Sequence, residues 1–125
     1  MTPEMLENLA LFTLRAVLSL IFLSSGWAHV RAPEQRGESI GVPATVAWGL
    51  GVVEILAGVS LLVGVFVRAG AMLVMLVMLG AIYKKIFVWK SGFFGENGGG
   101  WYYDLLYLSA AFVALATGGG DWVLV

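Results

Sequence analysis

Hydrophobic residues gather into four long runs that short polar segments separate. The runs cover approximately residues 9–30, 44–66, 69–89 and 101–117, and the last is the shortest. An α-helix needs about 20 mainly apolar residues, rising about 1.5 Å each, to cross the hydrocarbon core of a bilayer. The pattern therefore predicts an all-α protein with one domain, residues 1–125, folded as an antiparallel bundle of four transmembrane helices.

Helix-starting and helix-breaking residues mark the ends of these runs. Thr2-Pro3 is typical of an N-cap followed by proline at the first helical position. Residues 32–43 contain two prolines, two glycines and three charges, which predicts a loop. Arg68 is expected in a tight hairpin between the second and third runs. Residues 91–100 (SGFFGENGGG) predict another loop, and the glycines at 118–120 end the last helix.

Composition excludes several classes of protein. The chain is 60% hydrophobic and 12% charged, against about 25% charged in ordinary soluble domains. It has no Cys and one His, so we predict no metal site and no covalently bound cofactor. A net charge of −1 argues against a nucleic-acid partner. The expected partner is the lipid bilayer, and association into a homo-oligomer is left open.

Basic residues predict the orientation in the cell membrane. The loops after the first and third runs share one side, which carries Arg31, Arg36, Lys84, Lys85 and Lys90. The opposite side carries Arg68 alone. Because positive loops stay in the cytoplasm, we expect a multi-pass protein with residues 31–43 and 90–100 cytoplasmic and both termini outside.

Two ionisable residues lie deep within the hydrophobic runs. Arg15 and Glu54 are each about ten residues into a predicted helix, roughly 15 Å from its end. Charges at such depth are costly and by default mark functional sites. We expect the two side chains to pair, either to lock two helices together or to serve chemistry. Helical spacing places them on two polar or small-residue stripes, which we expect to face the bundle interior. The stripes are Arg15, Ser19, Phe22, Gly26 and His29, and Ala47, Gly51, Glu54 and Gly58.

The other polar residues gather toward the cytoplasmic ends of the runs. His29, Lys84, Lys85 and Asp104 lie at that level, together with several aromatic residues. This predicts a polar cavity that opens to the cytoplasm. The candidate ligand-binding residues are Ser19, Trp27, Trp48, Lys84, Trp101 and Tyr103. Simpler readings remain open, because aromatics at helix ends form interfacial belts and lysines there set topology or extend to the interface.

Short motifs follow one another along the chain in a particular order. They are Leu14-Arg15 leading to residues 21–26 (IFLSSG), Gly41-Val42-Pro43, residues 51–58 (GVVEILAG) continuing to 62–68 (LVGVFVR), Ala81-Ile82, and Gly92-Phe93-Phe94 before a glycine run. In this order and spacing the chain resembles the DoxX family of small four-helix membrane proteins. Two positions depart from that family's pattern. Asp104 stands where many members have Glu, and Lys84-Lys85 replaces a histidine often found after the third helix.

The resemblance implies membrane redox work. The related DoxD proteins belong to a thiosulfate:quinone oxidoreductase, and other members associate with detoxification enzymes. The implied function is a redox-associated membrane subunit with a cavity for a quinone or another small ligand. Glu54 and Arg15 would then serve proton transfer and charge pairing, and His29 and Asp104 would relay protons. Without an electron carrier of its own, the chain would be at most one subunit of an oxidoreductase, working with a redox enzyme or another membrane subunit.

Two other classes of function fit the same pattern. A non-catalytic scaffold or assembly factor would use the Arg15–Glu54 pair to set helix register. A small solute transporter would use the predicted cavity as part of a pathway.

Overall fold

The computed structural model describes residues 1–95 and 99–124. Every regular element in these residues is a helix, so the all-α prediction is confirmed. The elements are α1 (Pro3–Arg31), α2 (Pro33–Ile40), α3 (Ala44–Val63), α4 (Val67–Tyr83), η1 (Lys84–Val88) and α5 (Tyr102–Thr117). Three helical segments are long and apolar enough to cross a membrane, namely α1, α3 and Val67–Val88. The 16-residue α5 is apolar but shorter.

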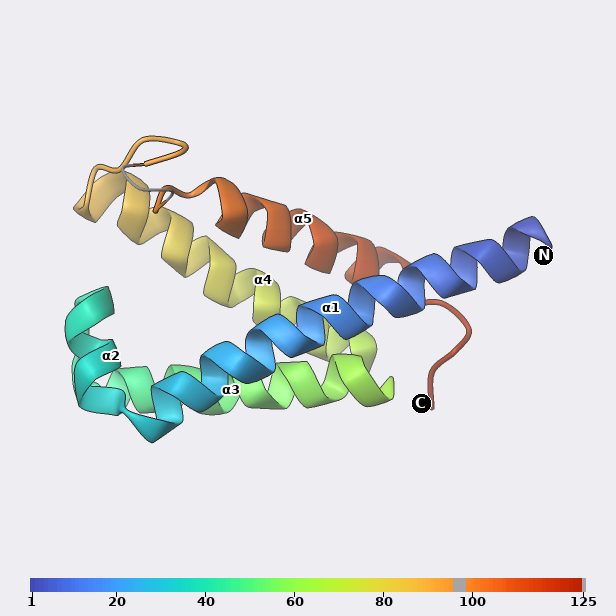
Figure 1. The fold of residues 1–125 in the computed structure, drawn as a ribbon, viewed down its shortest axis with the longest axis horizontal. Helices are drawn as coiled ribbons and strands as arrows, with labels where there is room; N and C mark the ends of the chain where they lie inside the picture. The colour runs from blue at the N-terminus through green and yellow to red at the C-terminus, as the bar shows by residue number, and fades with distance from the viewer. Residues whose placement is uncertain (96–98, 125) are drawn as a thin grey trace.

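The helices form two pairs that diverge from a common end. α1 packs chiefly against α3, and α4 packs chiefly against α5. Figure 1 shows both pairs meeting at the end that holds the two chain termini and spreading apart toward the opposite end, where α2 lies. Within each pair the chain runs in opposite directions (Figure 1).

Small residues let α1 and α3 approach closely. A Cβ built on Gly51 would lie 2.7 Å from the carbonyl oxygen of Gly26, and one on Gly26 would lie equally close to that of Gly51. Such contacts are typical of helix pairs packed in lipid. Both predicted interior stripes are confirmed by burial. The buried residues include Arg15, Ser19, Phe22, Gly26 and His29 on α1 and Ala47, Gly51, Glu54 and Gly58 on α3.

The hydrophobic core fills the half of the bundle nearest the termini. Residues of α1, α3, α4 and α5 meet there, so this half is packed with side chains. The core consists of Leu18, Phe22, Ala57, Leu61, Val67, Ala71, Val74, Met78, Ala111 and Ala114.

Two connections differ from the sequence prediction. Residues 32–43 are not simply a loop, because Pro33 at the first helical position starts the short helix α2, which ends at Gly41 with φ 73°. Arg68 does not form the hairpin. Gly64 and Phe66, both with positive φ, make that turn, and Arg68 lies in the first turn of α4. Of the predicted loop 91–100, residues 96–98 lie outside the described part of the chain.

The end of α4 holds a further feature that the pattern did not predict. From Lys84 the helix continues as a π-helix, in which the Trp89 amide donates to the Lys84 carbonyl at 2.8 Å. π-turns within longer helices are rare and occur frequently at functional sites.

The predicted caps are confirmed. Thr2 Oγ1 accepts from the Met5 amide at 3.1 Å, and Gly118 ends α5 with φ 72°.

We expect Gly51→Ala to lower the free energy of unfolding by about 1–3 kcal/mol, because the added methyl would push α1 away from α3. Gly49→Ala is the matched control on the same helix, since no atom lies within 4 Å of a Cβ built there. Thermal unfolding in detergent, followed by circular dichroism, measures both. Equal stability of the two variants would contradict a close contact between α1 and α3.

Candidate functional site

A cavity of about 670 Å³ lies between the two helix pairs, toward the end where they spread apart. Its volume is within the range of sites that hold small organic ligands. Apolar side chains from α1, α3 and α4 form much of the wall, and polar side chains enter from α1, α2, α3, η1 and α5. The polar lining residues are Ser25, His29, Arg36, Ser39, Glu54, Lys84, Lys85, Tyr103, Asp104 and Tyr107.

The first polar cluster joins α1 and α3. The Ser25 hydroxyl lies 3.1 and 3.2 Å from the two Glu54 carboxylate oxygens and donates to them. His29, one helical turn further along α1, has Nδ1 at 2.7 Å from the Ser25 carbonyl oxygen and at 3.7 Å from Glu54 Oε2. A bond to a carbonyl requires a proton on Nδ1, so Nε2 is left for other contacts. The close approach of Gly26 and Gly51 brings these side chains together.

The second polar cluster joins η1 and α5. Lys85 Nζ lies 2.7 Å from Asp104 Oδ2 and donates to the Tyr103 hydroxyl at 2.5 Å and to the Gly100 carbonyl at 3.2 Å. The ammonium also lies 3.8 Å from the centroid of the Tyr103 ring. Lys85 and Asp104 are both buried. The π-turn is the local structure that carries Lys85 to this position.

The helix α2 covers the side of the cavity near the first cluster. Arg36 and Ser39 line the cavity from α2. Lys84 Nζ donates to the carbonyls of Ile40 and Gly41 at 2.6 and 2.7 Å, which satisfies the free carbonyls at the C-terminus of α2. Lys84 therefore attaches α2 to the end of α4.

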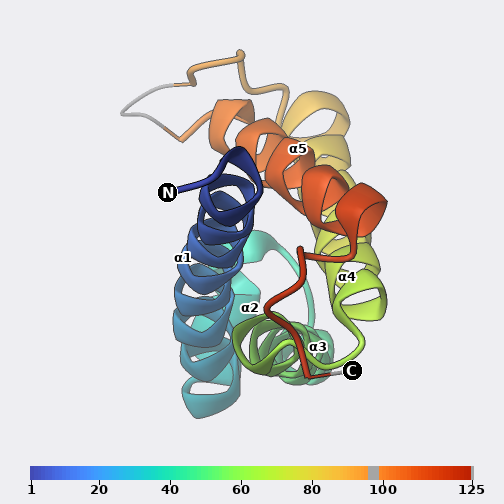
Figure 2. The same ribbon diagram turned by 90° about the vertical axis from the view of Figure 1, so that its right-hand side faces the viewer.

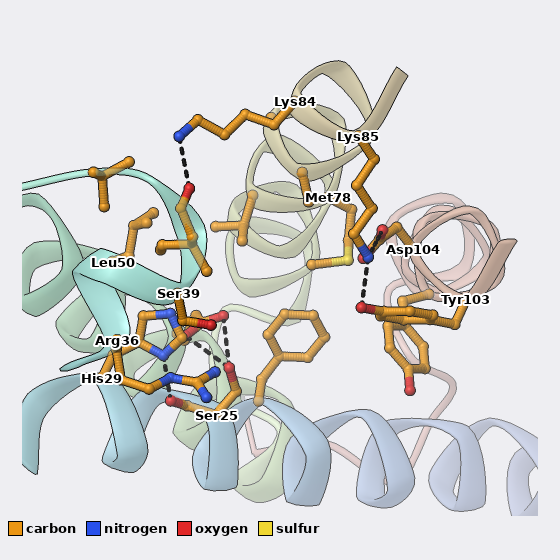
Figure 3. A pocket seen from close by; sticks show the side chains of 18 of the residues that line it. Ser25, His29, Arg36, Ser39, Leu50, Met78, Lys84, Lys85, Tyr103 and Asp104 are labelled. Atoms are coloured by element: carbon orange, nitrogen blue, oxygen red, sulfur yellow. Dashed lines mark hydrogen bonds and ion pairs between the residues drawn. The ribbon is translucent and has the colours of Figure 1, made fainter. Parts of the chain in front are cut away.

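The two clusters lie on different sides of one apolar space. Figure 3 shows Ser25, His29, Arg36 and Ser39 on one side and Lys85, Tyr103 and Asp104 on the other, with Met78 between them. This arrangement suits a molecule with an apolar body and polar atoms at both ends. Carboxylate, imidazole and phenol groups at the two sides also supply sites for proton exchange. Within residues 1–95 and 99–124, no group of three or more His, Cys, Asp or Glu side chains could hold a metal ion.

The predicted pairing of Arg15 with Glu54 is wrong. The Arg15 guanidinium donates to the Leu61 carbonyl at 3.3 Å and to the Trp122 carbonyl at 2.5 Å. Glu54 instead faces Ser25, which is ten residues further along α1, or about 15 Å at helical rise. The predicted pairing assumed equal depths in two helices, whereas α1 begins at Pro3 and α2 occupies part of the connection.

Arg15 closes the end of the molecule opposite the cavity. It is 1% exposed and binds a free carbonyl near the C-terminus of α3. A Cβ on Gly64 or Gly119 would lie within 2.7 Å of the Arg15 side chain, so glycine at both positions makes room for it. The Leu124 amide donates to the Gly64 carbonyl at 2.9 Å. In Figure 2 the C-terminal segment accordingly crosses this end from α5 toward α3.

Other predicted ligand-binding residues also lie outside the cavity. Ser19 is buried and donates to the Gly58 carbonyl at 2.8 Å, which joins α1 to α3. Trp27 and Trp48 are 57% and 52% exposed. Trp101 packs edge-on against Phe93, with ring centroids 4.8 Å apart. The predicted residues that do line the cavity are His29, Glu54, Lys84, Tyr103 and Asp104.

Five polar lining residues were not assigned to the site from the sequence, although Lys85 was placed at its level. Ser25 precedes His29 by four positions, so helical spacing could have identified it. Arg36 and Ser39 were assigned to a loop, and only Pro33 indicated a helix there. Tyr107 lies one turn beyond Tyr103 on the same face of α5.

Comparison with known proteins identifies the family of this chain. The sequence profile of the DoxX family matches residues 10–89. The chain belongs to the DoxX family. The matched region includes Ser25, His29 and Glu54, whereas Tyr103 and Asp104 lie beyond it.

A curated relative is an uncharacterized membrane protein of Mycobacterium tuberculosis, 36% identical to this chain over 93 residues. The alignment covers 68% of this chain and 57% of the relative, so the chain spans little more than half of that protein. No solved structure matches. The DoxX-family chain is therefore a membrane protein with three apolar helices long enough to span a bilayer.

We expect Arg15→Gln to lower the free energy of unfolding by about 2–4 kcal/mol, because charge-assisted hydrogen bonds to two carbonyls are lost. Arg31→Gln is the control, since Arg31 lies exposed at the end of the same helix. Thermal unfolding in detergent measures both. An Arg15→Gln protein as stable as the Arg31→Gln protein would show that the closed end does not depend on this side chain.

Proposed function

We propose that this DoxX-family protein is a redox-associated membrane subunit whose cavity binds the headgroup of a quinone. The observation that supports the proposal is the placement of hydrogen-bonding groups at two sides of one apolar cavity (Figure 3). A para-quinone carries carbonyl oxygens at opposite edges of a flat apolar ring. One oxygen would accept from Nε2 of His29 in its protonated form, beside Ser25, and the other would accept from the Tyr103 hydroxyl, beside Lys85.

In this proposal the chain exchanges the protons and a partner supplies the electrons. Reduction of a quinone to a quinol takes up two electrons and two protons, and breaks no bond between heavy atoms. The sequence has no Cys, and a redox enzyme or another membrane subunit would supply the electrons. Glu54 at one side and the Lys85–Tyr103–Asp104 cluster at the other are the groups that would exchange the two protons.

The packing favours binding over passage of a solute. The cavity lies toward one end of the bundle, and the hydrophobic core together with Arg15 fills the other end. A transport pathway would have to open this packed half. The scaffold alternative shares the fold but requires no ligand, so a binding measurement separates it from the quinone proposal.

We also propose that α1, α3, the α4–η1 segment and α5 all cross the cell membrane as an antiparallel bundle. Five basic residues in or next to residues 31–43 and 84–90, against Arg68 on the other side, favour a cytoplasmic location for those segments. Both termini would then lie outside.

Cysteine labelling in cells tests this topology without background, because the chain has no native Cys. With a membrane-impermeant maleimide, we expect Thr2→Cys and Leu124→Cys to react in intact cells. Ser91→Cys should react only after permeabilisation. If Leu124→Cys behaves like Ser91→Cys, α5 does not cross the membrane. If Ser91→Cys reacts in intact cells and the other two variants react only after permeabilisation, the proposed orientation is wrong.

A calorimetric titration of the purified protein with decylubiquinone tests the binding proposal. We expect saturable binding that weakens roughly tenfold in His29→Gln, as for the loss of one strong hydrogen bond of about 1.4 kcal/mol. A similar loss is expected in Glu54→Gln, because the negative charge that favours protonated His29 is removed. Trp27→Phe is the control, because this exposed side chain lies outside the cavity.

A protein that binds no quinone in this titration contradicts the proposal. A stable partner that co-purifies equally with the native protein and with Glu54→Gln would then favour a scaffold. Equal weakening in Trp27→Phe would show that the measured binding occurs at the lipid-facing surface.

A further inference from the structure

Arg36 is a cavity-lining cation with unused hydrogen-bonding capacity. It is partly buried on α2, and Figure 3 shows it on the same side of the cavity as Ser25, His29 and Ser39. Its Nε atom is buried and has no hydrogen-bond partner among the residues that the structure describes. The ion pairs in that part of the chain are His29–Glu54 and Lys85–Asp104, and neither includes Arg36.

Four other basic residues have clear partners. Arg15, Arg68 and Lys84 each donate to backbone carbonyls at the end of a helix. Lys85 is paired with Asp104. Arg36 differs because its charge acts on Glu54 and His29 only from beyond the distance of an ion pair. The Glu54 carboxylate instead accepts from the Ser25 hydroxyl.

A buried guanidinium Nε without an acceptor is costly, because that donor has lost its contact with water. A ligand that supplies a negatively charged oxygen would give this donor an acceptor, and the planar guanidinium suits two parallel bonds to such a group. The cavity charges also favour an anion. Three cationic side chains line it, namely Arg36, Lys84 and Lys85, against two carboxylates, Glu54 and Asp104. The lining therefore carries one excess positive charge before His29 is counted.

We infer that Arg36 is a ligand-binding residue and that the cavity prefers a ring carrying an anionic oxygen, such as an ionised hydroxyl or a carboxylate, over a neutral ring. Ser39 lies on the same helix and the same side of the cavity and would contribute a further hydroxyl donor (Figure 3). The inference rests on the proposed quinone function for the ring, but the anion preference depends on Arg36 alone.

Three bicyclic probes of similar size separate charge from quinone chemistry. They are 1,4-naphthoquinone, which is neutral, 2-hydroxy-1,4-naphthoquinone, which is ionised at neutral pH, and 2-naphthoate, which is an anion without quinone carbonyls. Calorimetric titration of the full chain in detergent gives each affinity. We expect the hydroxyquinone to bind the native protein about 10- to 100-fold more tightly than 1,4-naphthoquinone, as for one charge-assisted contact.

Arg36→Gln should remove this preference, so that the hydroxyquinone and 1,4-naphthoquinone bind with affinities within about threefold of each other, and circular dichroism shows that the variant folds. Arg36→Lys should retain part of the preference, because the charge remains and the paired geometry is lost. Arg31→Gln is the control, with an exposed arginine near the same end of the bundle, and should behave as the native protein.

Each other outcome has a definite reading. Equal affinities for the charged and neutral quinones in the native protein, or a preference that survives Arg36→Gln, overturn the inference while the quinone proposal stands. Binding of 2-naphthoate and the hydroxyquinone, without the neutral quinone, supports the anion site and contradicts a general quinone site. Binding of none of the probes contradicts both. If Arg36→Gln unfolds and the added substitution Glu54→Gln restores the stability of that variant, then Arg36 is a partner of Glu54 and the inference fails.

Discussion

The close contact between Gly26 and Gly51 is the constraint on which the site depends. In a bilayer, helices gain little by hiding apolar side chains from one another, because the lipid is equally apolar. Two backbones in direct contact gain dispersion energy and bring short polar side chains within reach. Ser25 is the neighbour of Gly26, and His29 and Glu54 lie about one turn beyond Gly26 and Gly51. The hydrogen bond from Ser25 to Glu54 spans the same interface. A larger residue at either glycine would separate the helices and the polar cluster together.

Charge has different roles at the two ends of the bundle. At the end with the termini, Arg15 and Arg68 satisfy carbonyls near the C-termini of α3 and α5, and the packed core extends up to them. At the other end, the helix pairs spread and ionisable side chains line an open volume (Figure 1). The protein thus combines a packed half, where cations bind carbonyls at helix ends, with a half whose cations and carboxylates line a cavity.

Helical spacing and residue size were enough to predict which faces of α1 and α3 are buried. A stripe of polar or small residues at every third or fourth position is stable in lipid mainly when it packs against another helix. Relative depth was not predictable in the same way. α1 has 29 residues and α3 has 20, so equal counts from a helix end do not give equal depths. Arg15 was therefore matched to the wrong partner, and Arg36 was considered only as a basic residue of a loop. The exposed Trp27 and Trp48 follow the interfacial-belt reading.

The π-turn has a mechanical consequence for the molecule. Its first two residues extend in different directions, Lys84 to the end of α2 and Lys85 to Asp104 on α5 (Figure 3). Helices α2 and α5 do not touch in the described structure. They are nevertheless linked through two consecutive lysines of a single turn. A displacement of α2 that pulls on Lys84 would be transmitted along the backbone to Lys85. The position of Asp104 and α5, on the far wall of the cavity, would then change when α2 moves.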